Sequence, residues 1–248
     1  PSWAATDVKR KSMMAVPERF VLRMIQDGWV YRTRGVWNKS NYMPESVTDR
    51  LAHTWEPVYM FTQRGDYWWD LDAIRKPYSE YSRKMAHRQE SGTERGSRTE
   101  HGGIGDSSNS RVDTMHPKGK NPGDVITTPT AQYPDAHYAV FPDELVADPI
   151  KASVPPRVCE ACGTPYEPGE EPMTQPCSCT ADGVKPGVVL DPFAGRGTVG
   201  KVAGKHGRRY VGIDLDPESV ELADEYVPDG RTRTLDQFDG GISDADAG

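Results

Sequence analysis

The spacing of apolar residues in the carboxyl-terminal third predicts a strand, a turn, a helix and a second strand. Two short apolar runs, Val188–Leu190 and Tyr210–Ile213, have the length of buried strands. Between them, Gly195 and Gly197 allow a tight turn because they carry no Cβ. Thr198 can then begin a helix whose first N–H groups point back at the turn. This order of elements predicts an α/β fold and half of a nucleotide-type binding site.

The amino-terminal third has a pattern of its own. Apolar residues at helical spacing, with a proline at the start and a glycine after the end, predict a helix over residues 17–27. Residues 29–37 and 57–62 have the composition of two strands, and we expect the aromatic-rich residues 65–70 to extend their edge. Over residues 83–120 apolar side chains are few while Gly, Ser and Arg are frequent, which predicts a flexible loop.

Two acidic residues follow the predicted strands of the glycine turn and narrow the choice of ligand. Asp214 lies at the carboxyl end of the second strand, where it can accept hydrogen bonds from ribose hydroxyls. Asp191 and Pro192 directly follow the first strand, and a carboxylate there repels the pyrophosphate of a dinucleotide. S-adenosylmethionine (AdoMet) carries a sulfonium, an amine and a ribose, so it suits both acids. Another nucleotide and a purely structural glycine turn are the alternatives.

The sequence DPFAGRGTVG, followed by GIDLDPE, resembles the AdoMet-binding motif of the DNA amino-methyltransferases, which methylate N4 of cytosine or N6 of adenine. The usual form in that family is D-P-F-x-G-S-G-T-T; here Arg196 replaces the serine and Val199 the second threonine. The resemblance implies an AdoMet-dependent methyltransferase (Rossmann-like) fold, α/β with a mixed sheet. It assigns the cofactor site to these residues: Asp191, Pro192, Phe193, Gly195, Gly197, Thr198 and Asp214.

Three further segments resemble the same family, in an order that indicates its permuted class. Residues 37–50, WNKSNYMPESVTDR, are similar to W-x-K-x-N-x-x-P-E-S-V-x-D-R of phage and bacterial members, and residues 56–61 resemble H-E-x-V-F-x-F. Residues 137–142, HYAVFP, resemble H-x-A-x-F-P and add three residues to the expected AdoMet pocket: His137, Phe141 and Pro142. A buried histidine bonded to backbone explains His137 equally well. Because the glycine motif comes last, the catalytic half precedes the cofactor half.

This order predicts four regions along the chain. Residues 1–75 form the carboxyl-terminal part of the catalytic half, which holds the target base. Residues 76–123 form a flexible basic loop, either a target-recognition region that contacts DNA or a solvated linker. Residues 124–229 form the AdoMet-binding half, with a zinc-binding insertion at 157–180, and residues 230–248 form an acidic tail.

The catalytic motif of the family, Asp/Asn/Ser-Pro-Pro-Tyr or -Phe, is absent from the sequence. The Pro-Pro pair that occurs, Pro155-Pro156, is followed by Arg157. In the permuted class the motif lies upstream of Trp3, so we expect an N-terminally incomplete chain that supplies two flanks of a sheet without its centre. The alternative is a non-catalytic module that binds AdoMet and DNA. The catalytic residues are therefore unknown. Residues 37–50 look most like Ser-Pro-Pro-Tyr members, which favours N4 of cytosine over N6 of adenine.

Charge is divided unevenly along the chain. The net charge is −7, but residues 1–123 carry 20 basic and 15 acidic side chains, whereas residues 124–248 carry 10 and 22. A basic half suits double-stranded DNA as a partner; the alternative is that the charge is uneven by chance and that the tail is acidic.

No apolar run approaches the roughly 18 residues of a membrane span, and the start has no signal-peptide pattern. We therefore expect a cytoplasmic protein of a bacterium or phage-infected cell, of restriction-modification type, with no membrane partner.

The four cysteines form one cluster with the pattern C-x2-C-x14-C-x-C: Cys159, Cys162, Cys177 and Cys179. Thiolates at C-x2-C can bind one Zn²⁺ from a tight turn, and a second pair completes a tetrahedron. The sequence predicts a structural zinc ion, because all four positions are filled by protein. Unliganded cysteines or disulfides are the alternative, and disulfides are uncommon in the cytosol.

Overall fold

The computed structural model of the chain describes residues 8–90, 115–131, 141–167, 176–180, 183–227 and 231–234. Contacts divide the chain into two compact units, one comprising Pro1–Trp69 with Gly123–Gly248 and the other Asp70–Pro122. His137, the middle of the expected basic loop, parts of the expected zinc-binding insertion and most of the acidic tail lie outside the described residues. Among these described ranges, none of the helices combines the length and apolar character that crossing a bilayer requires.

The amino-terminal elements of the first unit form a small mixed sheet with a helix. Helix α1 spans Val16–Gln26 and leads into strand β1, Val30–Lys39, which pairs antiparallel with β2, Trp55–Thr62. Strand β3, Val125–Thr128, joins the other edge of β1 in parallel. The predicted helix and both predicted strands are confirmed, whereas β3 was not predicted.

The expected extension of this edge over residues 65–70 is wrong. Those residues form bends and irregular structure, and side-chain bonds fix them instead of a ladder. Arg32 Nε donates to the Tyr67 hydroxyl at 3.1 Å, and the Trp68 indole N–H donates to the Tyr166 carbonyl at 3.1 Å. The aromatic residues that suggest a strand in the sequence therefore act as anchors of a loop.

The second unit contains a short 3₁₀ helix η2, Asp72–Ile74, and helix α2, Glu80–Glu90. The expected flexible loop is therefore wrong over residues 83–90, where α2 continues. Two local interactions favour this helix despite its polar sequence. The Ser79 hydroxyl accepts a hydrogen bond from the Ser82 N–H at 3.1 Å, as an N-terminal cap does, and Lys84 lies 3.8 Å from Glu80 one turn away.

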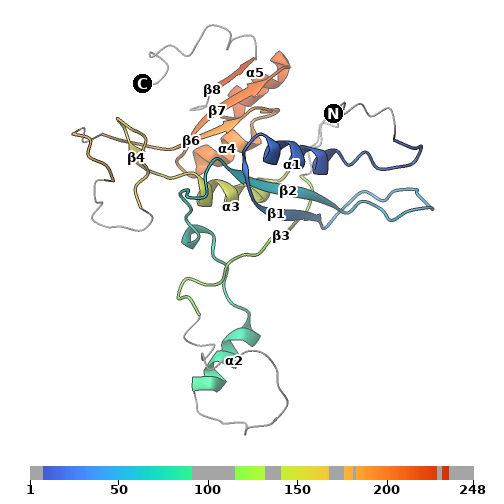
Figure 1. The fold of residues 1–248 in the computed structure, drawn as a ribbon, viewed down its shortest axis with the longest axis horizontal. Helices are drawn as coiled ribbons and strands as arrows, with labels where there is room; N and C mark the ends of the chain where they lie inside the picture. The colour runs from blue at the N-terminus through green and yellow to red at the C-terminus, as the bar shows by residue number, and fades with distance from the viewer. Residues whose placement is uncertain are drawn as a thin grey trace. The chain divides into compact units, whose positions relative to one another are not determined.

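The carboxyl-terminal half of the first unit holds the predicted glycine-turn unit, drawn in orange to red in Figure 1. Three parallel strands form its sheet in the order β6, β7, β8: Val188–Asp191, Arg209–Asp214 and Arg231–Thr234. Three helices belong to this half: α3, Asp143–Ser153; α4, Thr198–Lys205; and α5, Pro217–Tyr226. The strand–turn–helix–strand prediction is confirmed. Strand β8 lies in the expected acidic tail, whose first residues therefore pair with β7.

The described strands form three separate sheets. The sheet β2–β1–β3 is mixed, the sheet β6–β7–β8 is parallel, and a two-stranded antiparallel pair joins β4, Val158–Cys159, to β5, Val184–Lys185. The α/β class is thus confirmed.

A compact apolar core lies under the glycine turn, where α3 and α4 meet the parallel sheet. Its buried members are Ile150, Val189, Val202, Ala203, Tyr210 and Val227. The Tyr210 ring fits beneath α4 because position 200 is a glycine: a Cβ there would lie 2.6 Å from Tyr210 Cε1 and 2.8 Å from Val227 Cγ2. Contacts this short force a shift of the sheet or the helix.

We predict that Gly200→Ala lowers the free energy of unfolding by about 1–3 kcal/mol, as overpacking of a filled core does. Gly204→Ala, on the same helix, is the matched control because nothing lies within 4 Å of its Cβ position. There the higher helix propensity of alanine gives up to about 1 kcal/mol of added stability. Denaturant titration of both variants measures the difference, and equal stabilities would contradict the packing described for Tyr210.

Candidate cofactor site

The glycine turn begins at the carboxyl end of β6. Asp191 is the last residue of the strand, and its Oδ1 accepts a hydrogen bond from the Phe193 N–H at 3.1 Å. Gly195 and Gly197 both have positive φ angles, of 49° and 78°, which residues with a Cβ rarely adopt. A Cβ at Gly197 would in addition lie 3.2 Å from Cα of Ala223. The second glycine is therefore required by both conformation and space.

Asp214 fastens this turn to the neighbouring strand. Its Oδ2 accepts a hydrogen bond from the Gly195 N–H at 2.7 Å, and its Oδ1 accepts one from the Asp216 N–H at 3.0 Å. The Ala194 N–H donates to the Ile213 carbonyl at 2.9 Å, which adds a backbone connection at the same point. One half-buried carboxylate thus holds both loops that follow the paired ends of β6 and β7.

Two helix N-termini open at this edge of the sheet. Gly197 is the N-cap of α4, and Asp216 caps α5 by accepting from the backbone N–H groups of Glu218 and Ser219, each at 3.3 Å. The first N–H groups of α4 have no partner within the helix and carry a partial positive charge. The edge therefore offers carboxylates from the strand ends and N–H donors from α4.

Asp191 is held in an environment that disfavours its charge. Burial raises the pKa of this carboxyl above its usual range, the Phe193 N–H opposes the shift, and the nearby charge of Asp214 adds to it. Two carboxylates close together at a partly buried site favour a cationic ligand, because a positive charge relieves their repulsion.

A cavity of about 470 Å³ lies beside the N-terminus of α4. Its lining includes three of the predicted cofactor residues, Phe141, Pro142 and Thr198. The rest of the lining was not predicted: Asn41, Pro129, Thr130, Ala131, Asp143, Glu144 and Lys201. The volume falls within the range of small-molecule sites, about 300–1,000 Å³.

Two polar interactions shape this cavity. Lys201 Nζ lies 2.6 Å from Asp143 Oδ1, which places a cation and an anion in the lining. Asn41 Oδ1 accepts hydrogen bonds from the Thr130 N–H at 2.6 Å and from its hydroxyl at 3.2 Å. The sequence marks Asn41 only as part of the W-x-K-x-N segment, and nothing local points to Lys201 or Asp143. Their pairing becomes visible only when α3 and α4 are in place.

The predicted cofactor residues that the structure describes, all but His137, divide into two groups. Phe141, Pro142 and Thr198 line the cavity, and six others lie in the glycine turn or at the end of β7: Asp191, Pro192, Phe193, Gly195, Gly197 and Asp214. Phe193 is 86% exposed, and Leu215, which sequence reasoning did not select, is 78% exposed directly after Asp214. Leu215 could have been selected from the sequence, because it is an apolar residue within the acidic sequence DLDPE.

The side chains of residues 37–50 make hydrogen bonds and ion pairs within the segment and to the neighbouring strands β2 and β3. The Trp37 indole N–H donates to the Thr128 carbonyl at 3.2 Å, and Lys39 pairs with Glu56 on β2. Glu45 lies 2.7 Å from Arg50, and a hydrogen bond from the His53 N–H is the main cause that lowers the pKa of Glu45. The motif residues described here thus have structural partners, which keep Asn41 next to β3.

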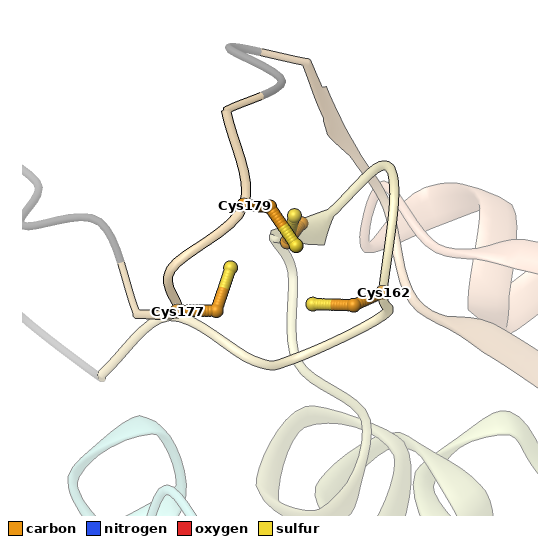
Figure 2. Close-up of side chains that lie close together, drawn as sticks. Cys162, Cys177 and Cys179 are labelled. Atoms are coloured by element: carbon orange, nitrogen blue, oxygen red, sulfur yellow. The ribbon is translucent and has the colours of Figure 1, made fainter.

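The four cysteine side chains converge, and Figure 2 shows the thiols of Cys162, Cys177 and Cys179 pointing toward one another. With Cys159 they form a set whose sulfur atoms all lie within 4.8 Å of one another. Cys159 is fully buried, and none of the four is in a disulfide. The predicted metal ligands are thus brought together.

A glycine turn, two strand-end acids and an adjoining cavity are the arrangement typical of proteins that bind a nucleotide-type cofactor. The family model described as DNA methylase matches residues 6–225, and the chain therefore belongs to the DNA amino-methyltransferase family. The Type II methyltransferase M.XycI of Xanthomonas campestris pv. cyanopsidis is 32% identical over 216 residues, which cover 87% of this chain and 50% of that protein. M.Cfr9I of Citrobacter freundii is 31% identical, with the same coverage.

The chain thus spans about half the length of these curated relatives. Among solved structures, the M1.HpyAVI–SAM complex matches 84% of this chain and 68% of that one, with 16% identity and a TM-score of 0.43.

We predict that Asp191→Asn stabilises the protein at neutral pH. A carboxyl whose pKa is raised by folding binds its proton more tightly in the folded state, so its stabilising contribution is largest at low pH. That contribution declines as the pH rises through the raised pKa. Asparagine removes the cost of the buried charge and can still accept from Phe193. The stability gain should therefore shrink on acidification, as measured by urea unfolding at pH 4 to 8. Glu221→Gln, on the exposed face of α5, is the control and should show no such trend. A variant less stable than the parent at pH 7 would contradict the assignment.

Proposed function

We propose that this chain binds AdoMet at the glycine turn and belongs to a protein that methylates an exocyclic amine of a DNA base. The observation that carries the proposal is the position of Asp214, which holds the glycine turn and lies where a ribose would offer its hydroxyls. The free lone pairs of this carboxylate accept from the ribose. The exposed side chains of Phe193 and Leu215 provide apolar surface for the adenine.

The amino-acid end of AdoMet fits the cavity next to the turn. That end is a zwitterion, and the cavity is lined by the Lys201–Asp143 ion pair together with the Thr198 hydroxyl. Lysine pairs with the carboxylate of the ligand and aspartate with its ammonium group, since each opposite charge favours the ionised form. A nearby positive charge stabilises the ionised Asp191 carboxylate, whereas a negative charge destabilises it further. The positively charged sulfonium of AdoMet therefore suits a position beside Asp191.

The substrate we propose is double-stranded DNA. The target base has to leave the helix stack to reach a cofactor pocket, at a cost of a few kcal/mol. Transfer would be direct: the amine lone pair would form a bond to the methyl carbon as the sulfonium S–C bond breaks, leaving S-adenosylhomocysteine, and the amine would then lose one proton. The side chain of a Ser/Asp-Pro-Pro-Tyr motif would accept a hydrogen bond from the amine and orient it. The resemblance of residues 37–50 favours N4 of cytosine, and the basic region 76–123 is the proposed contact with DNA.

The second cofactor that we propose is a structural zinc ion at the four cysteines.

A second candidate is a non-catalytic module that binds AdoMet and DNA. The absence of a Pro-Pro-Tyr or Pro-Pro-Phe motif from the 248 residues favours it. The coding sequence that precedes the codon for Pro1 discriminates the two: a Ser/Asp-Pro-Pro-Tyr motif there supports the enzyme, and its absence supports the module.

We predict that Asp214→Ala weakens the binding of S-adenosylhomocysteine by about 1–2 kcal/mol, because hydrogen bonds to the ribose and to the turn are lost. Lys201→Met should weaken it as well, but should leave 5′-methylthioadenosine, which lacks the amino-acid end, unaffected. Lys205→Met, in the last turn of the same helix and exposed, is the matched control. Titration calorimetry measures the parent, these three variants and Gly195→Leu. Unchanged affinity in both Asp214→Ala and Gly195→Leu would overturn the cofactor site.

We predict that tritiated AdoMet labels duplex DNA when the protein includes a Pro-Pro-Tyr segment, and that the labelled nucleoside is N4-methylcytosine. The 248 residues alone should give no label, since the motif that orients the amine is missing from their sequence. Label transferred by these residues alone would show that the catalytic motif lies within them in an unrecognised form. N6-methyladenine as the product would overturn the assignment of the base.

A further inference from the structure

The four cysteine sulfurs have the spacing of a single tetrahedral metal site. They lie within 4.8 Å of one another, and sulfurs about 2.3 Å from one Zn²⁺ are about 3.8 Å apart in an ideal tetrahedron. A cluster of several iron atoms would hold its four sulfurs farther apart. Soft thiolate ligands in this geometry select zinc, or a single iron, over harder cations. The donor set therefore fits one ion, and no sulfur is already used in a disulfide.

The first two ligands come from a tight turn that the backbone builds without help from a metal. The Gly163 N–H donates to the Cys159 carbonyl at 2.8 Å, and the Cys159 N–H donates to the Thr164 carbonyl at 2.9 Å. Gly163 has a φ of 73°, which allows the chain to reverse directly after Cys162. This turn aims two thiols to the same side, as C-x2-C turns of zinc sites do.

The cysteines lie in the segment between α3 and β6, residues 154–187, which we call the excursion. Both of its ends join elements of the cofactor half. It leaves after α3, and its two ends meet where the Gly187 N–H donates to the Pro155 carbonyl at 3.1 Å. A Cβ at Gly187 would lie 2.5 Å from that carbonyl oxygen, so the two ends are in close contact. Gly187 directly precedes β6, and its carbonyl accepts from the Arg209 N–H at 2.9 Å in the strand register. The two ends of the excursion are therefore bonded to each other directly before the strand that ends in Asp191.

The excursion also holds the aromatic loop that follows β2. Trp68 Nε1 donates to the Tyr166 carbonyl at 3.1 Å, and the Tyr166 N–H donates to the Arg157 carbonyl at 3.1 Å. The buried apolar side chains described in the excursion are few: Val158, Cys159 and Tyr166. A segment whose described residues contain so small a core gains much of its stability from a cross-link, if one is present.

We infer that one Zn²⁺ bound by Cys159, Cys162, Cys177 and Cys179 is the cross-link that fixes the connection from α3 to β6 and anchors Trp68 through Tyr166. This inference rests on the structural zinc ion of the proposed function and adds what that ion does: it holds two parts of the chain together. The ion fills no catalytic position, because all four ligands are protein. It acts by holding the chain that leads into the glycine turn.

The presence of the ion is tested by metal analysis of the full chain purified without added metal. We expect one zinc per molecule. After chelation, Co²⁺ should restore the visible absorption of a tetrahedral thiolate complex. Two disulfides in the mass spectrum, or four thiols that react with a disulfide reagent equally fast with and without zinc, would overturn the site.

The mechanical role is tested by comparing Cys162→Ser with Thr164→Val. Cys162 is exposed, so the serine removes a ligand without opening a core, whereas Thr164→Val removes the hydroxyl that lies 3.0 Å from the Cys162 sulfur and keeps all four ligands. Cys162→Ser should lose zinc, melt at a lower temperature and shift the emission of Trp68 toward that of an exposed indole. Thr164→Val should keep its zinc and the parent emission. Trp68→Phe in both backgrounds identifies the signal.

A zinc-free protein with unchanged melting temperature and unchanged Trp68 emission would overturn the role, even if zinc binds. Binding of S-adenosylhomocysteine to the zinc-loaded parent is measured separately. Its failure would count against the cofactor proposal and leave the zinc result untouched.

Discussion

The carboxylate of Asp214 is the interaction on which the organisation of the cofactor half depends. Through its two oxygens it holds the Gly195 N–H of one loop and the Asp216 N–H of the next, so both loops are fixed to the end of one strand. The positive φ of Gly195 is maintained by this bond as well as by the freedom of glycine. Preorganised loops lower the cost of ordering on binding, so the same group that can contact a ribose also reduces the entropy lost when it does.

The cavity beside this turn is assembled from segments far apart in the sequence. Asn41 reaches Thr130 across 89 residues, and Lys201 reaches Asp143 between two helices of the core. Each pairing places a polar group in the lining and satisfies part of its hydrogen-bonding or charge requirement. The segment at residues 37–50 therefore contributes to the cavity through Asn41, although the resemblance alone assigns it to the catalytic half.

The glycine-turn unit could be predicted because its signals are local. Apolar runs, glycines and the acids at the strand ends follow one another within 30 residues, and each element is short enough to be recognised from neighbouring residues. Helix α3 was missed because Pro149 lies inside it, although acidic residues in its first turn were an available signal. Helix α2 was missed because capping and charge pairs, not apolar residues, favour it.

The composition of the cavity could not be predicted, since no sequence pattern links Lys201 to Asp143. The cysteine set was predictable for the opposite reason. Its four members lie within 21 residues, and a tight turn brings the first two together whatever the rest of the chain does. Residues 65–70 show the limit of composition: aromatic side chains indicated a strand, but their hydrogen bonds to Arg32 and Tyr166 fix a loop.

The most direct test is a crystal structure of the chain with S-adenosylhomocysteine. We expect the ribose hydroxyls within hydrogen-bond distance of Asp214 and the amino-acid end in the cavity beside Thr198 and Lys201. Ligand density that avoids Asp214, or that leaves the cavity empty while the ribose lies at the turn, would contradict it.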